Sequence, residues 1–350
     1  MEWRTPDYFS SFRCLASDCP HSCCIGWEVS VDAETAAFYQ TVSGPLGEKL
    51  RRHLTEEDGE FSFPLHGGRC PFLDPQNLCE IHRRLGEEHT SVTCRSHPRF
   101  IEEYGSLREI SLVASCPAAN ALLLGSQAPL TFPVCVTEEP PSFPPDVWLP
   151  PLLLCRDRAL GILQDRTRPL RSRMVWFLLF ANEAQVLLDE DRTEELPELC
   201  EAFDELPDDL PEELPAAGPG LFPRALEVLG EREPLEPDWP SFLQAAQASP
   251  EGIFCPDWAG ERILTYFVFR YFLKAVGDGD LLSRAELAVF SLLVIGRLSS
   301  VLGLAEALRR YCREIEHCPE NLAALQQSFC EDDDLSLSHF FRELNRTEPH

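Results

Sequence analysis

Residues 14–27 read CLASDCPHSCCIGW and hold four cysteines within eleven positions. These cysteines are Cys14, Cys19, Cys23 and Cys24. Thiols so close in sequence cannot each have a separate place in a hydrophobic core, so they are bridged, bound to a metal or catalytic. Eight of the 15 cysteines lie in the first 116 residues, and the other four of these are Cys70, Cys79, Cys94 and Cys116.

The rest of the sequence favours a reducing compartment for these thiols. The first residues, MEWRTPDYFS, have no basic start followed by an apolar run, so they do not predict a secretory signal. The most apolar stretch, residues 287–304, carries Arg297 and three serines, and it predicts a buried helix rather than a membrane span. We therefore expect a cytoplasmic protein, in which clustered cysteines are more often metal ligands than disulfides.

The charge of the chain limits its partners. Its formal net charge is −28, so phosphates are repelled, and we expect no binding to nucleic acid and none to membranes. A cationic partner, such as a protein that presents lysines, is compatible with this charge. Acidity also serves solubility, so the acidic segment 189–213 is either a solvated loop of short helices or a rim that attracts a basic substrate.

Length and cysteine distribution predict two domains. We expect a Cys-rich domain that binds a metal or an iron–sulfur cluster over 1–124, a proline-rich connector over 125–151 and a helical domain over 152–350. The helical domain carries an acidic, proline-rich insertion near 189–250. The predicted fold class is mainly α, with a small Cys-rich α+β N-terminal domain followed by an all-α helical domain.

Short periodic stretches predict the elements of the first domain. Trp27, Val29 and Val31 alternate like a strand, and Asp32 follows them as the N-cap of a helix over 33–40. The other predicted elements are a strand over 61–65, a short helix ended by Gly86 and a strand over 110–114. Elements this short enclose little core, so a metal centre would help to hold the domain together.

Longer helices are predicted in the second half, over 169–191, 258–280 and 302–318. The second of these ends at GDGD (277–280), which is a helix stop rather than a ligand loop. In the third, helical spacing places five residues on one buried face, where Cys312 is a core residue. These residues are Leu304, Leu308, Tyr311, Cys312 and Ile315.

Clustered thiolates suit zinc or an iron–sulfur cluster. Zinc sites usually contain CxxC-like pairs, and this chain has no CxxC, whereas iron–sulfur loops tolerate uneven spacing. Gly26 stands where a radical S-adenosylmethionine enzyme would have its third cysteine, so that signature is absent. A cysteine nucleophile is the alternative, with His21, His82 or His97 as its base. Arg95 and Arg99 are either neighbours that balance an anionic centre or plain surface residues.

Several of these stretches resemble the flagellin lysine-N-methylase family. The resemblance lies in CLASDCPHSCCIGWEVSVDAET, GRCPFLDPQNLCEIHRRLGEEHTSVTCRSHPR and LREISLVASCPAA, and all eight N-terminal cysteines fall on the family's pattern. TYFVFRYFLKAVGDGDL and YCREIEHCPENLAAL resemble its C-terminal signatures, so the similarity runs from about residue 7 to about residue 330. The family shares its eight-cysteine module with a broader group of zinc- or iron-chelating proteins.

The resemblance implies a protein-lysine N-methyltransferase that moves a methyl group from S-adenosylmethionine to lysine ε-amines of flagellin. It also implies a [4Fe–4S] cluster, with zinc as the alternative, and it gives metal- and cofactor-binding roles to the eight cysteines of the module. These are Cys14, Cys19, Cys23, Cys24, Cys70, Cys79, Cys94 and Cys116. The alternative functions are a non-enzymatic zinc- or iron-chelating protein and a thiol oxidoreductase, against which the missing CxxC counts.

Methyl transfer needs a neutral lysine amine, whose ordinary pKa is about 10.4, so the enzyme must desolvate the amine or offer it a base. The candidate bases are Glu102, Glu103, Tyr104, Glu109, Glu314 and Glu316. Glu314 and Glu316 fit an exposed helix face equally well. No glycine fingerprint of a Rossmann-type loop follows a predicted strand, so the usual loop for S-adenosylmethionine is not visible.

Overall fold

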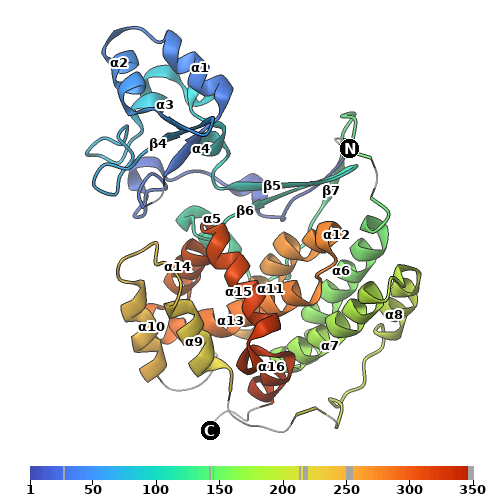
Figure 1. Ribbon diagram of the computed structural model, residues 1–350. Helices are drawn as coiled ribbons and strands as arrows, with labels where there is room; N and C mark the ends of the chain where they lie inside the picture. The colour runs from blue at the N-terminus through green and yellow to red at the C-terminus, as the bar shows by residue number, and fades with distance from the viewer. Residues whose placement is uncertain are drawn as a thin grey trace.

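The computed structural model describes the chain apart from Trp27, Ser142, Pro145, Glu213 and three short ranges, 216–219, 250–254 and 346–350. A small cysteine module, which contains β2 to β4 and α1 to α4, lies at one end of a larger helical body, which contains α6 to α16 (Figure 1). The strands are β1 (Glu2–Arg4), β2 (Val29–Val31), β3 (Thr55–Glu57), β4 (Glu60–Phe63), β5 (Arg99–Tyr104), β6 (Leu107–Leu112) and β7 (Val134–Val136).

Short helices occupy the module and its junction with the body. They are α1 (Ala33–Thr41), α2 (Gly44–His53), α3 (Glu80–Leu85), α4 (Val92–Ser96) and α5 (Pro117–Leu123). The body is helical: α6 (Leu149–Gln164), α7 (Leu170–Asp189), α8 (Leu196–Ala202), α9 (Phe222–Gly230), α10 (Trp239–Ala248), α11 (Asp257–Tyr271), α12 (Ala275–Asp278), α13 (Leu282–Leu302), α14 (Leu304–Glu316), α15 (Pro319–Glu331) and α16 (Leu337–Leu344). The predicted mainly-α fold class is confirmed.

The module has its own sheet, in the antiparallel order β2-β4-β3. Val29 and Val31 pair with Phe63 and Phe61, as their alternation predicts, whereas Trp27 lies outside the described residues. Asp32 caps α1 and accepts a hydrogen bond from the backbone N–H of Thr35. Helices α1 to α3 cover this sheet and enclose a second hydrophobic core, which includes Tyr39, Leu50, Phe63, Phe72 and Ile81.

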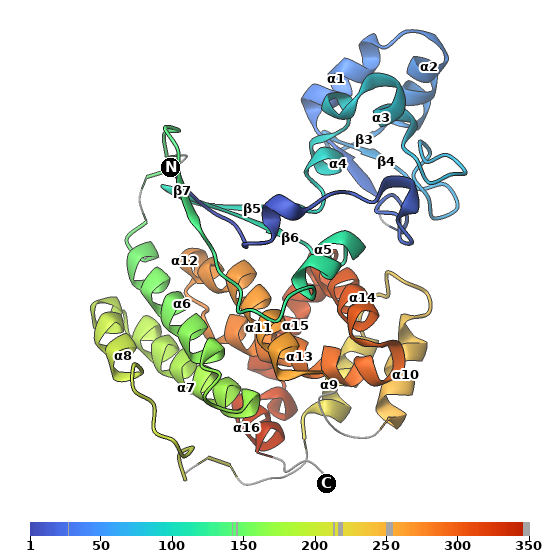
Figure 2. The ribbon, with the colours of Figure 1, turned by 180° about the vertical axis from the view of Figure 1, so that it is seen from behind.

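A second sheet, in the order β5-β6-β1-β7, joins the module to the body (Figure 2). β5 and β6 form an antiparallel hairpin, β1 lies parallel to β6, and β7 pairs antiparallel with β1. β7 belongs to the proline-rich connector, and Leu107 and Leu112 of β6 pack into the core of the body. The boundaries proposed at 124 and 151 remain predictions.

Helix α13 forms the centre of the body, in contact with α7, α10, α11, α14 and α15. It is long and apolar enough to cross a membrane, but 83% of its most apolar window is buried inside the protein. This burial confirms the predicted core helix. The stop after α12 is also confirmed, because Gly279 adopts the left-handed conformation at its C-cap.

The predicted buried face of α14 is confirmed for Leu308, Tyr311, Cys312 and Ile315. The interpretation of Glu314 and Glu316 as an exposed face is wrong. The Glu314 residue is 1% exposed, and the Glu316 side chain is 0% exposed. α14 is covered by α13, α15 and α5, so periodicity toward a single core underestimates how much of the helix is buried.

Candidate metal centre

Three of the predicted ligands border the second hydrophobic core of the module. Cys70 is buried within this core, and Cys24 and Cys79 pack against it. The Cys70 backbone N–H donates to the Cys24 carbonyl at 2.9 Å, and Cys79 pairs with Leu73 in an antiparallel bridge. The loop that carries Cys24 and the segment that carries Cys70 and Cys79 are far apart in the sequence, and they meet at this core.

Cys94 joins this group from α4. The Ser91 hydroxyl accepts from the Cys94 backbone N–H, and Asp32 accepts from that of Val92, so the N-cap of α1 also fixes α4. Cys94 reaches the surface, but the protein around its thiol desolvates it and raises its pKa to about 12, with further contributions from Cys79 and Cys70. We call Cys24, Cys70, Cys79 and Cys94 the inner thiols.

The remaining thiols lie on the side of the module that faces the helical body. The Cys14 Sγ accepts from the Ala16 N–H, the Cys19 Sγ donates to the His21 carbonyl, and Cys116 stands at the N-cap of α5. Burial raises the pKa of Cys116, and charges on Cys19 and Cys14 would raise it further. We call Cys14, Cys19 and Cys116 the outer thiols.

Cys23 stands between the two groups. Its Sγ lies 4.0 Å from the Sγ of Cys24. The hydrogen bond from Cys24 lowers the pKa of Cys23, and the same pair raises that of Cys24. Cys23 is thus the thiol of this pair that ionises first.

All 15 cysteines are free, so the disulfide alternative has no pair in this structure. Among the described residues, no group of three or more Cys, His, Asp or Glu side chains is placed to hold a metal ion. The eight predicted ligands gather in two groups but do not form a closed ligand set. The donor chemistry nevertheless fits a thiophilic centre, because ionisation of one thiol affects the next and a bound metal removes the protons.

Arg313 of α14 is the arginine that meets the cysteine loop. Its Nη2 donates to the Ile25 carbonyl at 2.7 Å, and its charge lowers the pKa of Cys23. Gly26 has a φ of +82°, and a Cβ there would lie 3.2 Å from Arg313 Nη2, so a glycine suits this contact.

The sequence analysis did not identify Arg313, because it lies 288 residues after Ile25 and no local pattern predicts their contact. The roles considered for Arg95 and Arg99 remain predictions. Arg95 donates to the Thr90 carbonyl, and Arg99 lies exposed over the Phe12 ring.

Two half-buried histidines lie beside this contact. The ring centroids of His97 and His317 are 5.9 Å apart, and His317 Nε2 lies 2.6 Å from the Ser115 hydroxyl. Burial, together with the charge of Arg313, lowers the pKa of His97 to about 4 and that of His317 to about 3. Both rings are neutral near pH 7. His21 instead lies 3.6 Å from Glu306, and His82 is exposed.

The five carboxyls among the six candidate bases already have polar partners. Glu102 binds Lys274, Glu103 binds Arg108, and Glu109 forms a buried double contact with Arg156. Glu316 accepts hydrogen bonds from Tyr266 and Tyr271 and forms an ion pair with Arg270.

Glu314 accepts from the backbone N–H groups of Leu235 and Glu236, both at 2.8 Å. Burial outweighs these contacts and raises its pKa to about 7. Glu314 therefore changes its protonation state near neutral pH.

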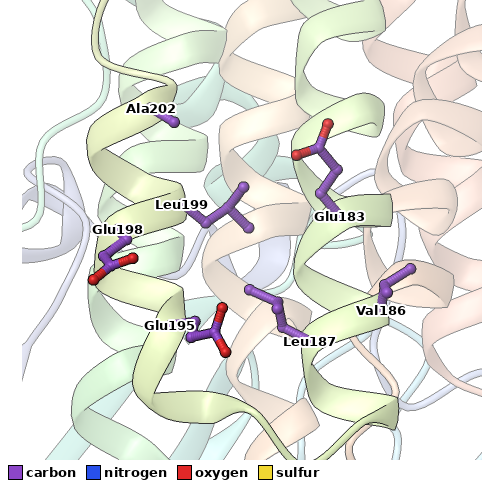
Figure 3. Close-up of a pocket in the computed structure, with 7 residues that line it drawn as sticks. All are labelled: Glu183, Val186, Leu187, Glu195, Glu198, Leu199 and Ala202. Carbon is purple, nitrogen blue, oxygen red and sulfur yellow. The ribbon is translucent and has the colours of Figure 1, made fainter.

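An open groove of about 390 Å³ lies between α7 and α8, at the acidic segment (Figure 3). Apolar side chains line it together with Glu183, Glu195 and Glu198. Glu195 pairs with Arg192. The acidic segment contains a short helix with a proline in its first turn, α8, in line with the prediction of a solvated loop of short helices. This segment lies far from the cysteine module (Figure 1).

Comparison with known families separates the same two regions. Residues 13–111 match a model described as "Putative zinc- or iron-chelating domain". Residues 156–253 match the FliB lysine N-methylase C-terminal domain. The first match spans seven of the eight cysteines, all but Cys116.

Curated relatives come from Salmonella. The flagellar biosynthetic protein FliU of Salmonella muenchen is 30% identical over 127 residues, which is 34% of this chain and 75% of that protein. The chain belongs to the flagellin lysine-N-methylase family. Members named lysine-N-methylase, from Salmonella typhimurium and Salmonella choleraesuis, are each 30% identical over 126 residues.

The matched part covers about a third of these two methylases, 31% of their length and 34% of this chain. No solved structure matches the chain. The family membership thus stands on sequence, and the arrangement of its two regions is seen here in the computed structure.

Proposed function

We propose that this chain is a cytoplasmic, S-adenosylmethionine-dependent lysine N-methyltransferase that acts on flagellin and needs a metal centre in its cysteine module. The observation that carries the proposal is the match to the lysine N-methylase C-terminal domain over 156–253. The cysteine module alone also matches proteins described only as metal-chelating. The helical region therefore supports the enzymatic assignment.

The inner thiols, with Cys23, are the proposed ligands of the centre, because Cys24, Cys70 and Cys79 meet at one small core and the charges of these thiols and of Cys94 act on one another. The charges of the outer thiols act on one another, and we propose these thiols as the candidates for a second centre. A [4Fe–4S] cluster there would supply a thiophilic cross-link and an electron carrier, and a zinc ion would supply the cross-link alone.

Arg313 has the positioning role in this proposal. A centre held by thiolates is anionic, and the guanidinium beside Cys23 offsets part of that charge. Its hydrogen bond to Ile25 ties the cysteine loop to α14, and α14 also carries Glu314. Metal binding in the module is thereby linked to the helical body, which holds the methylase match.

A substrate lysine must lose its proton before it attacks the sulfonium methyl group. A pKa of about 7 would let Glu314 take up a proton near neutral pH, but Glu314 is 1% exposed and both of its oxygens already accept backbone N–H groups. Glu102, Glu109 and Glu316 each pair with a lysine or an arginine, so we assign the acceptor role to none of these carboxyls.

The test is a methylation assay on the metal-loaded protein with S-adenosylmethionine and flagellin, read as methyl-lysine by mass spectrometry. Wild-type protein is expected to modify lysines. Cys23→Ser is expected to lose both metal and activity. Cys330→Ser removes an exposed cysteine from α15 and serves as the matched control, which should retain both. A loaded wild-type protein that leaves flagellin unmodified would reject the proposal.

A non-enzymatic chelator is the second candidate, favoured by the match of the module to a metal-chelating domain. Iron, acid-labile sulfide and zinc measured on one anaerobic preparation separate the possible centres. Equal iron and sulfide with a brown colour indicate a cluster. A colourless protein that contains zinc indicates a structural ion. Metal without methyl transfer would leave the chelator as the function.

A further inference from the structure

Most deeply buried arginines of this protein contact a carboxylate, which offsets the cost of burying their charge. Arg156 pairs with Glu109, Arg173 with Glu261, Arg270 with Glu316, and Arg309 with Glu236 and Glu306. Arg262 of α11 differs from them. It is 1% exposed, and within the described part of the chain it forms no ion pair.

The contacts of Arg262 leave one edge of its guanidinium unused. Nε donates to the Leu123 carbonyl at the end of α5, and Nη1 donates to the Ala128 carbonyl. Nη2 has no hydrogen-bond partner among the residues that the structure describes. Arg262 lines a cavity of about 330 Å³, together with Asp7, Tyr8, Ala121, Leu122, Gly125 and Ser126.

Tyr8 brings a second donor to this cavity, and within the described part of the chain its hydroxyl forms no hydrogen bond. Burial raises the pKa of its phenol, so the hydroxyl stays protonated. The ring packs in the main hydrophobic core, and Arg262 is close enough for its charge to act on the phenol. A buried guanidinium and a phenol that share one cavity are suited to an incoming carboxylate.

Asp7 adds the opposite charge to the same cavity. Its Oδ2 accepts from the backbone and the hydroxyl of Thr131, at 3.3 and 3.2 Å, while Oδ1 has no contact among the described atoms. Asp7 is exposed, whereas Arg262 is buried. The cavity thus has a cationic inner wall and an anionic rim.

We propose that this cavity binds the α-amino-acid group of a ligand, with its carboxylate on Arg262 and Tyr8 and its ammonium on Asp7. The charges of Asp7 and Glu261 act on Arg262 from a distance, and a ligand carboxylate would give it the direct ion pair that it lacks within the described part of the chain. The volume lies within the range of small-molecule sites, which begins at about 300 Å³.

Given the proposed function, on which this part of the inference rests, the occupant is the methionine portion of S-adenosylmethionine. Helix α5 begins directly after Cys116 and ends at the cavity, and its seven residues span about 10 Å at the rise of an α-helix. The site is therefore separate from the cysteines but close to the outer thiols.

The test is calorimetric binding of S-adenosylhomocysteine, methionine and adenosine to the full chain. S-adenosylhomocysteine carries the amino-acid group and cannot donate a methyl group. We expect Asp7→Asn to weaken its binding about tenfold and Tyr8→Phe about three- to tenfold. Methionine should show the same dependence at lower affinity, and adenosine should show none.

A control variant separates binding from structure. Tyr311→Phe removes a buried hydroxyl that contacts Ser291 elsewhere in the body, and it should bind S-adenosylhomocysteine like the wild type. Arg262→Gln should abolish binding, and circular dichroism would report whether that variant folds.

The outcomes distinguish the two proposals. If wild-type protein methylates lysine while Asp7→Asn and Tyr8→Phe bind S-adenosylhomocysteine normally, the cavity assignment is wrong and the methylase stands. If methylation is absent but methionine still binds through Asp7 and Tyr8, the cavity assignment stands without the methylase. If neither S-adenosylhomocysteine nor methionine binds the wild type, the cavity assignment is overturned.

Discussion

The helical body and the cysteine module treat their buried reactive groups differently. In the body, Arg270 and Glu316 lie in one network with Tyr266 and Tyr271, and both charges are satisfied by side chains of this chain. In the module, the nearest ionisable neighbours of the thiols are mainly other thiols. Burial and these neighbours raise the pKa of Cys24, Cys70 and Cys94, so these thiols stay protonated. This network of the body is complete with the protein's own side chains, whereas the module is suited to completion by a thiophilic metal.

Removal of the metal is expected to have the largest effect, and one confined to the module. In small metal domains the metal supplies much of the folding free energy. Under reducing conditions with a chelator, amide hydrogen exchange should accelerate about a hundredfold or more in α1 to α4 and change little in α13. If the chelator left hydrogen exchange in α1 to α4 as slow as before, the module would not depend on a metal for its stability.

Breaking the charge network should destabilise the body more than any surface change. Glu316→Gln leaves Arg270 buried without its counter-ion, and loss of one partner from such a pair costs about 3–5 kcal/mol. Denaturant unfolding measures this loss. Glu198→Gln on the exposed face of α8 is the control, and its stability should stay within about 0.5 kcal/mol of the wild type.

Alanine substitutions at two glycines test how the cysteine loop contacts the helical body. Gly26 and Gly59 both have positive φ, but only at Gly26 would a Cβ approach Arg313. Alanine should cost each position about 1 kcal/mol of backbone strain. Only Gly26→Ala should also raise the pKa of Cys23, measured by the pH dependence of thiol alkylation. Equal thiol reactivity in both variants would contradict the role of Arg313 in lowering the pKa of Cys23.

A pH dependence of stability is expected from His317. Its folded pKa of about 3 lies below the ordinary value of 6.5, so the neutral ring favours folding. That contribution is complete above pH 6.5 and is lost as the pH falls toward 3. His317→Asn should therefore lose less stability than the wild type between pH 6.5 and 4, by about 1–2 kcal/mol in denaturant unfolding. Parallel pH profiles would argue against a neutral ring at this junction.

Local patterns predicted the elements, while long-range partners escaped them. The alternation of Val29 and Val31 and the left-handed stop at Gly279 each depend on a few neighbouring residues, and both are confirmed. The cysteine module was visible because its thiols have few other uses. Arg313, nearly 290 residues after its partner Ile25, had no local signal.

The main error of the sequence analysis was to underestimate how many charged groups are buried. Glu314 looked solvent-exposed because helical periodicity records one apolar face, whereas its partners are backbone N–H groups of a distant segment. Arg262 was not singled out at all, since it sits within an apolar run and its significance lies in the direct ion pair that it lacks among the described residues. Such features depend on tertiary contacts that a sequence pattern does not encode.

The pairing of β7 with β1 has a practical consequence for dissecting the protein. A fragment that stops at residue 124 would keep every cysteine of the module but lose β7. The outer edge of β1 would then present unpaired backbone groups, and such edges recruit strands from other molecules. Fragments intended for metal titration should therefore extend past Val136, so that self-association is not mistaken for a metal-driven change.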